Sequence, residues 1–493
     1  MLAALLLASG GERADPRTPP ALPGQPPPFL GTAVVGSGGL TAAIDAYGDV
    51  VDMRPAPAGA PLIENPADRQ AAGTVPADTG IAPVVRVGDG PARPLWTADA
   101  VGQRYRPGTN VLETVARFGQ VRVRLVFAAT GSFLACLTRV EGDARVSLRS
   151  DEAAAAKGLR CDDGAARRIV REAEAGDRRW LRRARPLALE APVWAERMYA
   201  RSLLALRALT DRRSGAVAAG ARDGWAYVWP RDAATAALAY AAAGYRPEAE
   251  LATQFMLGLG IEQAARFHGD GSPVRGRAAQ GDEIGWVAAA AEATGLIGSA
   301  RHASRILSPV YPVPWRDRAD YREGEPGDFL ANAIASGEPA EQIEREFGVG
   351  SGLAREHGQE GAFDSAAAWA VRPFPRPQLF ERVHRTLARL SAESGPYGLL
   401  PGQDWSGGED PWSAPTAWNA WSLAALGDRA AALRLMAALR RGATAAGALP
   451  ERVDAQTGVP TSTTPLAWSH AFTILALQEL WPGRTASNFR PSR

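Results

Sequence analysis

The sequence predicts a mainly α-helical protein in which a helical toroid follows an N-terminal antiparallel β-sandwich. Three observations support this prediction. The chain has 493 residues, which is too long for one ordinary domain. Its hydrophobic pattern is strand-like between 29 and 140, and beyond Pro192 it repeats with the helical period of about 3.6 residues. The predicted helices are mainly Ala and Leu, whereas Trp, Asp, Glu, Gly and Pro occur in the loops between them.

Residues 1–28 are predicted to be a signal remnant or a disordered tether. The apolar run Leu2–Ala8 has no basic residue before it, and the stretch 11–28 is rich in Pro and charge. A clipped export signal and a disordered cytoplasmic N-terminus both fit, and a secreted or cell-envelope location is slightly favoured. No later segment reaches the ~20 uninterrupted apolar residues of a membrane helix.

Residues 29–145 are predicted to form the β-sandwich. Their apolar residues come in short β-branched runs between Gly and Pro, and Val121, Val123 and Leu125 alternate with arginines. Such alternation is typical of an antiparallel strand with one buried face. From 146 to 190 the chain becomes charged and rich in Ala and Arg, which predicts a linker with some helix.

Residues 191–485 are predicted to form the toroid, and 486–493 a tail. The candidate helices are 193–209, 232–243, 248–257, 282–294, 328–335, 339–347, 364–371, 378–392, 414–425, 429–439 and 466–480. Small residues let helices pack closely in two layers, which leaves the chemistry to the loops at one end.

Composition and motifs argue against several functional classes. The 55 Lys and Arg nearly balance the 53 Asp and Glu, without long runs of one sign, so no nucleic-acid or anionic-membrane partner is expected. Cys136 and Cys161 are the only cysteines and lack metal-site spacing. Phosphate-loop, H-E-x-x-H and G-x-S-x-G motifs are missing. We therefore predict no cofactor and no metal, and the oligomeric state stays open.

Four motifs stand in the predicted loops. They are Trp225–Ala233 (WAYVWPRDA), Gln280–Glu283 (QGDE), Asp320–Glu323 (DYRE), and Leu449–Val453 (LPERV) followed by Ser462–His470 (STTPLAWSH). In order and rough spacing they resemble the glucoamylase and glucodextranase family, glycoside hydrolase family 15, which also contains some bacterial trehalases. The resemblance covers about 192–480 and, more loosely, the β-rich part. It implies an (α/α)6 barrel as the catalytic domain behind the β-sandwich.

Cleavage of an acetal between two sugars needs a proton on the leaving oxygen and a nucleophile on the other face. When water is the nucleophile, two carboxyl groups stand about 6.5–9.5 Å apart, one protonated and one ionised. The resemblance makes Glu451, in the Leu-Pro-Glu motif, the catalytic base. The alternative is a surface glutamate that caps a turn or pairs with Arg452.

The resemblance aligns Glu323 with the family's general acid. Arg322 stands where the family usually has Trp, and a neighbouring arginine holds a carboxylate ionised, which is the wrong direction for an acid. Two interpretations follow: either Arg322 points into solvent, or the acid is weak, displaced or lost. Glu283 and Glu325 are the alternative acids.

Arg231 and Asp232 resemble the family's pair that binds the terminal, non-reducing glucose. An ionised Asp accepts two sugar hydroxyls while Arg orients it. The alternative is an N-cap Asp in a salt bridge at a helix start, and both could hold together.

Aromatic rings pack against the C–H faces of a pyranose. Each loop tryptophan alone is more often a core residue, but their clustering in the motif loops favours sugar binding. The segment 398–412 also resembles the rim of the family's site. The remaining predicted substrate-binding residues are Tyr227, Trp229, Glu283, Asp404, Trp412 and Trp468, and Trp225, Trp315 and Trp405 lie in or beside these loops. His470 is expected to be a buried helix-start residue that bonds a neighbour.

The resulting hypothesis is an exo-acting, inverting hydrolase that releases glucose from the non-reducing end of α-glucosides in an oligosaccharide or polysaccharide. The alternative is a weak or inactive family member that binds glucan or oligosaccharide. Prenyl transfer and polyene cyclisation, which also use helical toroids, would need metal-binding motifs that the sequence lacks. The choice among α-1,4, α-1,6 and α,α-1,1 linkages stays open.

Overall fold

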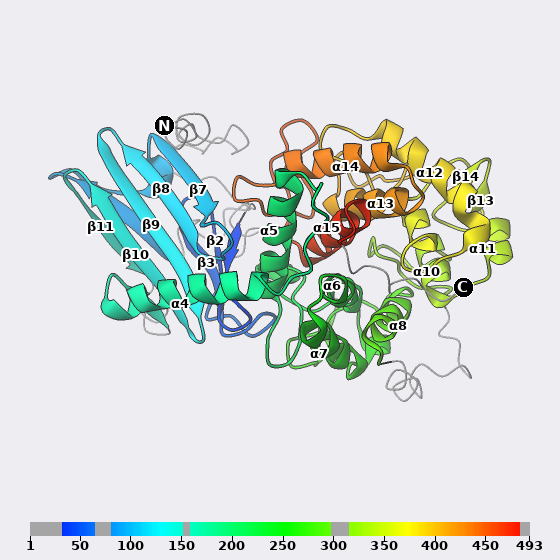
Figure 1. Cartoon of the computed structure of the whole chain (residues 1–493), viewed down its shortest axis with the longest axis horizontal. Helices are drawn as coiled ribbons and strands as arrows, with labels where there is room; N and C mark the ends of the chain where they lie inside the picture. Colours follow the sequence, from blue (N-terminus) through cyan, green and yellow to red (C-terminus); the bar gives the residue numbers. More distant parts are fainter. Residues whose placement is uncertain (1–31, 65–79, 151–157, 297–314, 484–493) are drawn as a thin grey trace.

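The computed structural model describes residues 32–64, 80–150, 158–296 and 315–483. A β-rich part and a helical part lie side by side, with helix α4 running across the strands toward the helical part (Figure 1). The predicted segments 1–28 and 486–493 lie outside the described residues. No helix of the described ranges is long and apolar enough to cross a membrane.

Two sheets form the β-rich part. The first has the order β1 (Ala33–Val35), β2 (Thr41–Ile44), β3 (Val50–Arg54), β5 (Ile81–Val87) and β11 (Ala144–Ser150), with β4 (Ile63–Glu64) beside β3 and β6 (Ala92–Pro94) beside β5. The second has the order β12 (Leu159–Cys161), β10 (Phe133–Glu141), β9 (Val121–Thr130), β8 (Leu112–Phe118) and β7 (Ala100–Tyr105). A short 3-10 helix, η1 (Leu95–Thr97), follows β6.

The two sheets share one apolar core. Val35 and Ile44 of the first sheet belong to the same buried cluster as Leu125, Phe127 and Leu134 of the second. The named strands pair antiparallel except β12, which runs parallel to β10. The predicted alternation in β9 is confirmed, because the apolar positions from 121 to 125 are buried and the arginines between them are partly exposed.

The segment 146–190, predicted as a linker, is largely ordered structure. It contains the end of β11, the strand β12 and the helix α4 (Gly164–Leu181). Asp163 caps α4 by accepting from the Ala166 amide at 2.6 Å, and Ile169 and Val170 pack against β9 and β10. The charged residues that suggested a linker are the solvent-facing side of an amphipathic helix.

The helical part matches the predicted periodicity, with each helix end within three residues of its predicted position. Its helices are α5 (Val193–Leu209), α6 (Pro230–Ala242), α7 (Arg246–Leu257), α8 (Glu283–Thr294), α10 (Leu330–Ser336), α11 (Ala340–Phe347), α12 (Phe380–Glu393), α13 (Ser413–Ala425), α14 (Arg429–Gly442) and α15 (Ala467–Leu480). Short elements are η2 (Asp223–Trp225), η3 (Ile261–Gln263), η4 (Ser365–Ala370), η5 (Pro377–Leu379), β13 (Gly348–Val349) and β14 (Gly352–Leu353). The predicted helix 364–371 is therefore the 3-10 helix η4.

Six elements form a ring in which each packs against the next. In order they are α6, α8, α10, η4, α13 and α15, and α15 packs against α6. Outside the ring, α5 packs on α15, α7 on α6 and α8, α11 on α10, α12 on η4, and α14 on α13.

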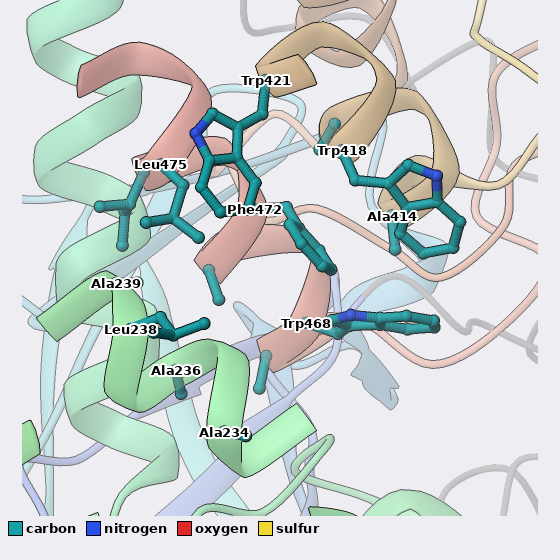
Figure 2. Close-up of a cluster of buried hydrophobic side chains, with 14 of the residues drawn as sticks. Ala234, Ala236, Leu238, Ala239, Ala414, Trp418, Trp421, Trp468, Phe472 and Leu475 are labelled. Carbon is teal, nitrogen blue, oxygen red and sulfur yellow. The ribbon is translucent and has the colours of Figure 1, made fainter. Parts of the chain in front are cut away.

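Small side chains on α6 allow this close packing. Ala234, Ala236 and Ala239 belong to one buried cluster with Phe472 and Leu475 of α15, and Figure 2 shows the two helices side by side. Opposite an alanine helix, a large side chain can fill the space without separating the two backbones. The centre of the ring is consequently a packed core, and the loops at its end are left for a site.

Candidate active site

All four motifs lead into the N-terminal ends of ring helices. The first precedes α6, the second α8, the third α10 and the last α15. Isolated β-bridges connect neighbouring loops at this end of the ring. They pair Gly220 with Leu466, Gln280 with Ala319, Asp364 with Gly402, and Trp412 with Arg452. The motifs, which are far apart in the sequence, therefore meet at one end of the ring.

Arg231 is a buried cation held by protein partners. Its Nη1 donates to Gln280 Oε1 at 2.7 Å and to both Asp282 oxygens at 2.9 and 3.0 Å, and its guanidinium lies 4.8 Å from the ring centre of Trp468. The residue that caps α6 is Trp229, not Asp232, which lies in the first helical turn. The N-cap interpretation of Asp232 is therefore wrong, although Asp232 does lie beside the Arg231 charge.

The Asp232 carboxylate is available to a ligand. It is 4% exposed, and no other described residue donates a hydrogen bond to it. Burial raises the pKa of Asp232 to about 7 against the opposing charge of Arg231, and the negative charges of Glu451 and Asp282 add to the rise. Sugar hydroxyls are suitable donors for such a group.

Glu451 lies in a loop whose backbone is held on both sides. Its amide donates to the Thr463 carbonyl, and its carbonyl accepts from the Ser413 amide, both at 2.9 Å. Its Oε2 accepts from the Ser462 hydroxyl and lies 3.7 Å from Arg452 Nε. The side chain is 16% exposed, which a solvent-facing surface residue would exceed. The turn-capping alternative is not what the structure shows, because the carboxylate bonds Ser462 eleven residues away.

Glu323 has a strained backbone and two strong partners. Its φ of 57° is in the left-handed region, which costs a residue other than glycine about 1–3 kcal/mol. Trp229 Nε1 donates to its Oε1 at 2.6 Å, and the Arg277 guanidinium contacts its Oε2. Arg277 pairs with Glu323 and also feels the charge of Glu451, so it lies near both predicted catalytic carboxylates.

Arg322 does not point into solvent. Its side chain is only 3% exposed and pairs with Asp364 and, at 2.9 Å, with Asp404. The arginine that contacts Glu323 is Arg277, which the sequence did not indicate. Of the two interpretations offered for Arg322, the solvent-facing one is wrong, and the concern about an arginine beside the acid applies to another residue.

The loop before α10 is fixed by a second arginine. Arg355 donates to both oxygens of Asp320 at 2.9 Å, and Asp320 Oδ1 also accepts from the Arg322 amide at 3.0 Å. Burial raises the pKa of Asp364, the partner of Arg322, to about 6. These buried pairs hold the motif loop whose last residue is Glu323.

The two alternative acids are poorly placed. Glu283 is fully buried at the start of α8, its Oε1 has no hydrogen-bond partner among the described residues, and burial raises its pKa well above the ordinary value. Glu325 is exposed. Glu283 thus supports the wall behind Arg231, and Glu325 lies outside the pocket.

The predicted aromatic residues fall into two groups. Trp468 is buried and contacts both Trp418, whose ring centre is 4.9 Å away, and the Arg231 guanidinium, 4.8 Å from its own ring centre; Figure 2 shows Trp468 beside Trp418. Trp412 packs edge-on against Trp405 at 5.2 Å, and Arg452 lies 5.7 Å from its ring centre.

Tyr227 and Trp229 both lie beside Arg266. The guanidinium of Arg266 lies 5.0 and 5.7 Å from their ring centres, respectively. Trp315 is a core residue, buried against Phe347 and bonded to Glu338.

His470 is confirmed as a buried residue that bonds its neighbours. Its Nε2 accepts from the Leu449 amide at 3.1 Å, so its Nδ1 donates to the Ser202 hydroxyl at 2.9 Å. Burial lowers its pKa to about 3. In the part of the chain that the structure describes, no cluster of three or more His, Cys, Asp or Glu could hold a metal ion.

Sequence reasoning missed the partners that lie between the motifs. Asp282 was inside a quoted motif but was not selected, and the Asp-Glu pair directly before an apolar helix was the signal for it. Arg277 and Asp364 lie in loops without any motif. Arg277 and Asp364 reach the site only because the helices close into a ring. No local sequence pattern specifies that arrangement.

Comparison with known proteins tests the resemblance to family 15. Residues 194–261 match the family model described as glycosyl hydrolases family 15. The predicted resemblance to family 15 is confirmed. The matched segment contains the Arg231 and Asp232 motif, whereas Glu323 and Glu451 lie beyond it.

Solved structures show how far the likeness in fold extends. A bacterial glucoamylase complexed with acarbose is 12% identical and superposes with a TM-score of 0.67 over 96% of this chain and 97% of its own. A wild-type glycosidase, 21% identical, gives 0.51 over 58% of this chain and 96% of its own. At these identities the likeness establishes the fold alone, and it covers the sheets and the helical ring together. The sequence matches no curated protein.

Proposed function

We propose that the chain is an exo-acting, inverting glycoside hydrolase that releases glucose from the non-reducing end of α-glucosides. The helical ring and its outer layer are interpreted as an (α/α)6 barrel. The observation that carries the proposal is that the loops of Asp232, Glu323 and Glu451 meet at one end of the ring, where Arg277 contacts Glu323 and feels the charge of Glu451.

Each group has a separate chemical task. Asp232 accepts hydrogen bonds from hydroxyl groups of the terminal glucose. Arg231, held by Asp282, fixes the buried surroundings of Asp232. Glu451 takes a proton from water as the water attacks the anomeric carbon, while Glu323 gives a proton to the leaving oxygen. Water attacks one face of the anomeric carbon while the glycosidic oxygen leaves from the other. The configuration is therefore inverted, and the product is β-glucose.

The test is glucose release by the purified chain from maltooligosaccharides, isomaltooligosaccharides and trehalose, with the product anomer followed by NMR. Glu451→Gln and Glu323→Gln should each lose on the order of 10³-fold in kcat, within the ~10²–10⁴ range of a positioned acid or base. Glu325→Gln is the matched control for Glu323, because this exposed residue lies two positions away, and it should retain wild-type rates. Release of α-glucose, or wild-type rates in either glutamine variant, would contradict the mechanism.

A second candidate function has a specific observation in its favour. The contact of Arg277 with Glu323 favours the ionised acid, so the chain would bind oligosaccharide and cleave it slowly or not at all. Calorimetric binding of maltooligosaccharide without any glucose release would establish this alternative.

A further inference from the structure

Three arginines lie near one another at the outer side, or mouth, of the site: Arg277 contacts Glu323, Arg452 is 3.7 Å from Glu451, and the charge of Arg266 acts on Arg277. Arg266 and Arg277 come from the loop between η3 and α8, and Arg452 follows Glu451 directly. Arg266 lies over Tyr227 and Trp229, donates to the Gly224 carbonyl at 3.2 Å, and has no carboxylate partner among the described residues. The mouth therefore carries more positive than negative charge.

The surplus lies on the outward side of the pocket. Arg277 is 42% exposed, whereas Asp232, where the terminal glucose would bind, is 4% exposed. The positive charge of Arg266 acts on Arg277 and, after burial, contributes to lowering its pKa, so the two guanidinium groups repel each other. A group that enters after the terminal glucose meets these two arginines first.

The only carboxylate that pairs with Arg277 in the described structure is Glu323. A general acid must carry a proton, whereas an ion pair stabilises the unprotonated form. A neutral leaving group offers Arg277 no other anion. An anionic leaving group offers one, and it also neutralises the charge of Arg266.

We propose that the leaving-group side of this site binds an acidic sugar, whose carboxylate or phosphate pairs with Arg277 and Arg266 and draws Arg277 away from Glu323. This inference rests on the proposed function. Glu323 then takes a proton from solvent and gives it to the glycosidic oxygen as the bond to the anomeric carbon breaks. Water forms the new bond and passes its proton to Glu451, so one water is consumed per bond.

The test compares disaccharides in which glucose is α-1,4-linked to glucuronate, to the neutral glucuronamide, to glucose 6-phosphate or to glucose. For wild-type protein we expect kcat/KM to be at least about tenfold higher for an anionic substrate than for its neutral counterpart, a factor worth about 1.4 kcal/mol. The glucuronate and phosphate arms identify which anion is preferred. Equal rates for charged and neutral substrates would overturn the inference and leave the proposed function intact.

Arg277→Gln provides the residue-level test. It should abolish the preference and raise the rate on neutral substrates, because Glu323 is released, whereas damage to the fold would lower every rate together. Arg275→Gln, an exposed position two residues away in the same loop, should keep the wild-type preference. A uniform fall for all substrates in Arg277→Gln overturns the inference, and the absence of cleavage of every α-glucoside, charged or neutral, by wild-type protein overturns the proposed function as well.

Discussion

The inner wall and the mouth of the candidate site are built in different ways. In the inner wall, Arg231 and Asp282 are buried together and satisfy each other's charge. At the mouth, Glu323, Arg277 and Arg452 are partly exposed. The difference is that the Arg231–Asp282 pair at the inner end is fully buried, whereas the Arg277–Glu323 pair at the mouth is partly exposed, where our proposal has a ligand replace it.

The largest effect on the free energy of unfolding is expected when the buried Arg231–Asp282 pair is broken. Asp282→Asn leaves the Arg231 charge without its nearest carboxylate, and breaking a buried pair costs about 3–5 kcal/mol. Urea unfolding should show this loss in the free energy of unfolding. The control is Glu250→Gln, which removes a surface ion pair with Arg246. It should change the free energy of unfolding by no more than about 0.5 kcal/mol. Similar effects of the two substitutions would contradict the comparison.

The pH dependence of stability gives a second test of the inner wall. The pKa of Asp232 is about 7 in the folded protein, compared with about 3.9 in an unfolded chain. Between these values the folded state keeps a proton that the unfolded state releases, so this group's contribution to stability falls as pH rises. The stability of wild-type protein relative to Asp232→Asn should therefore fall by up to about 4 kcal/mol from pH 4 to pH 8.

Groups common to both proteins do not affect this second test. Asp45 and Asp364 also have pKa values raised to about 6 by burial, but their contributions cancel in the difference between wild type and variant. A difference that stays constant with pH would show that Asp232 is ionised throughout this range.

The loop that carries Glu451 should respond less strongly. His470→Leu removes the acceptor of the Leu449 amide, and an unpaired buried donor costs about 1–3 kcal/mol. Because Leu449 is two residues before Glu451, kcat should fall with stability. His384→Leu, at a half-exposed histidine beside Asp428, is the control and should leave kcat unchanged. If both variants behave alike, His470 does not hold the catalytic loop.

The smallest effect is expected at Asp404. Its side chain is partly exposed, and Arg322 keeps its pair with Asp364 when Asp404→Asn removes one charge. In thermal unfolding, the free energy of unfolding of Asp404→Asn should therefore be less than about 1 kcal/mol below that of the wild type. A loss as large as that of Asp282→Asn would place Asp404 with the inner wall.

The sequence predicted what depends on local pattern. The helical period located every helix of the ring, and the motifs located Asp232 and Glu451. It predicted some helix in 146–190 but not that α4 packs on the sheet, because an amphipathic helix rich in arginine resembles a linker when its partner surface is unknown. It also did not reveal that Arg322 turns toward Asp364 and Asp404, since these residues lie 42 and 82 positions away in the chain.

Arg277 illustrates the same limit. It lies in the stretch Pro273–Arg277, which carries no motif, and bridges from Phe267 to Val228 and to Pro273 fold this loop back toward the site. Its contact with Glu323 is a product of tertiary structure alone. Our proposal of an acidic leaving group rests on this contact, which the sequence analysis did not anticipate.

Helix α4 has a consequence for how the protein unfolds. Its apolar face covers β9 and β10, while Trp180 near its end stacks on Tyr245 at 3.9 Å and donates to Glu248 of α7 at 2.8 Å. A helix that belongs to the cores of both parts couples their stabilities, so heat should melt the sheets and the ring in a single calorimetric transition. The β-rich part then acts as a thermodynamic partner of the ring, and loosening either one would lower the melting temperature of both.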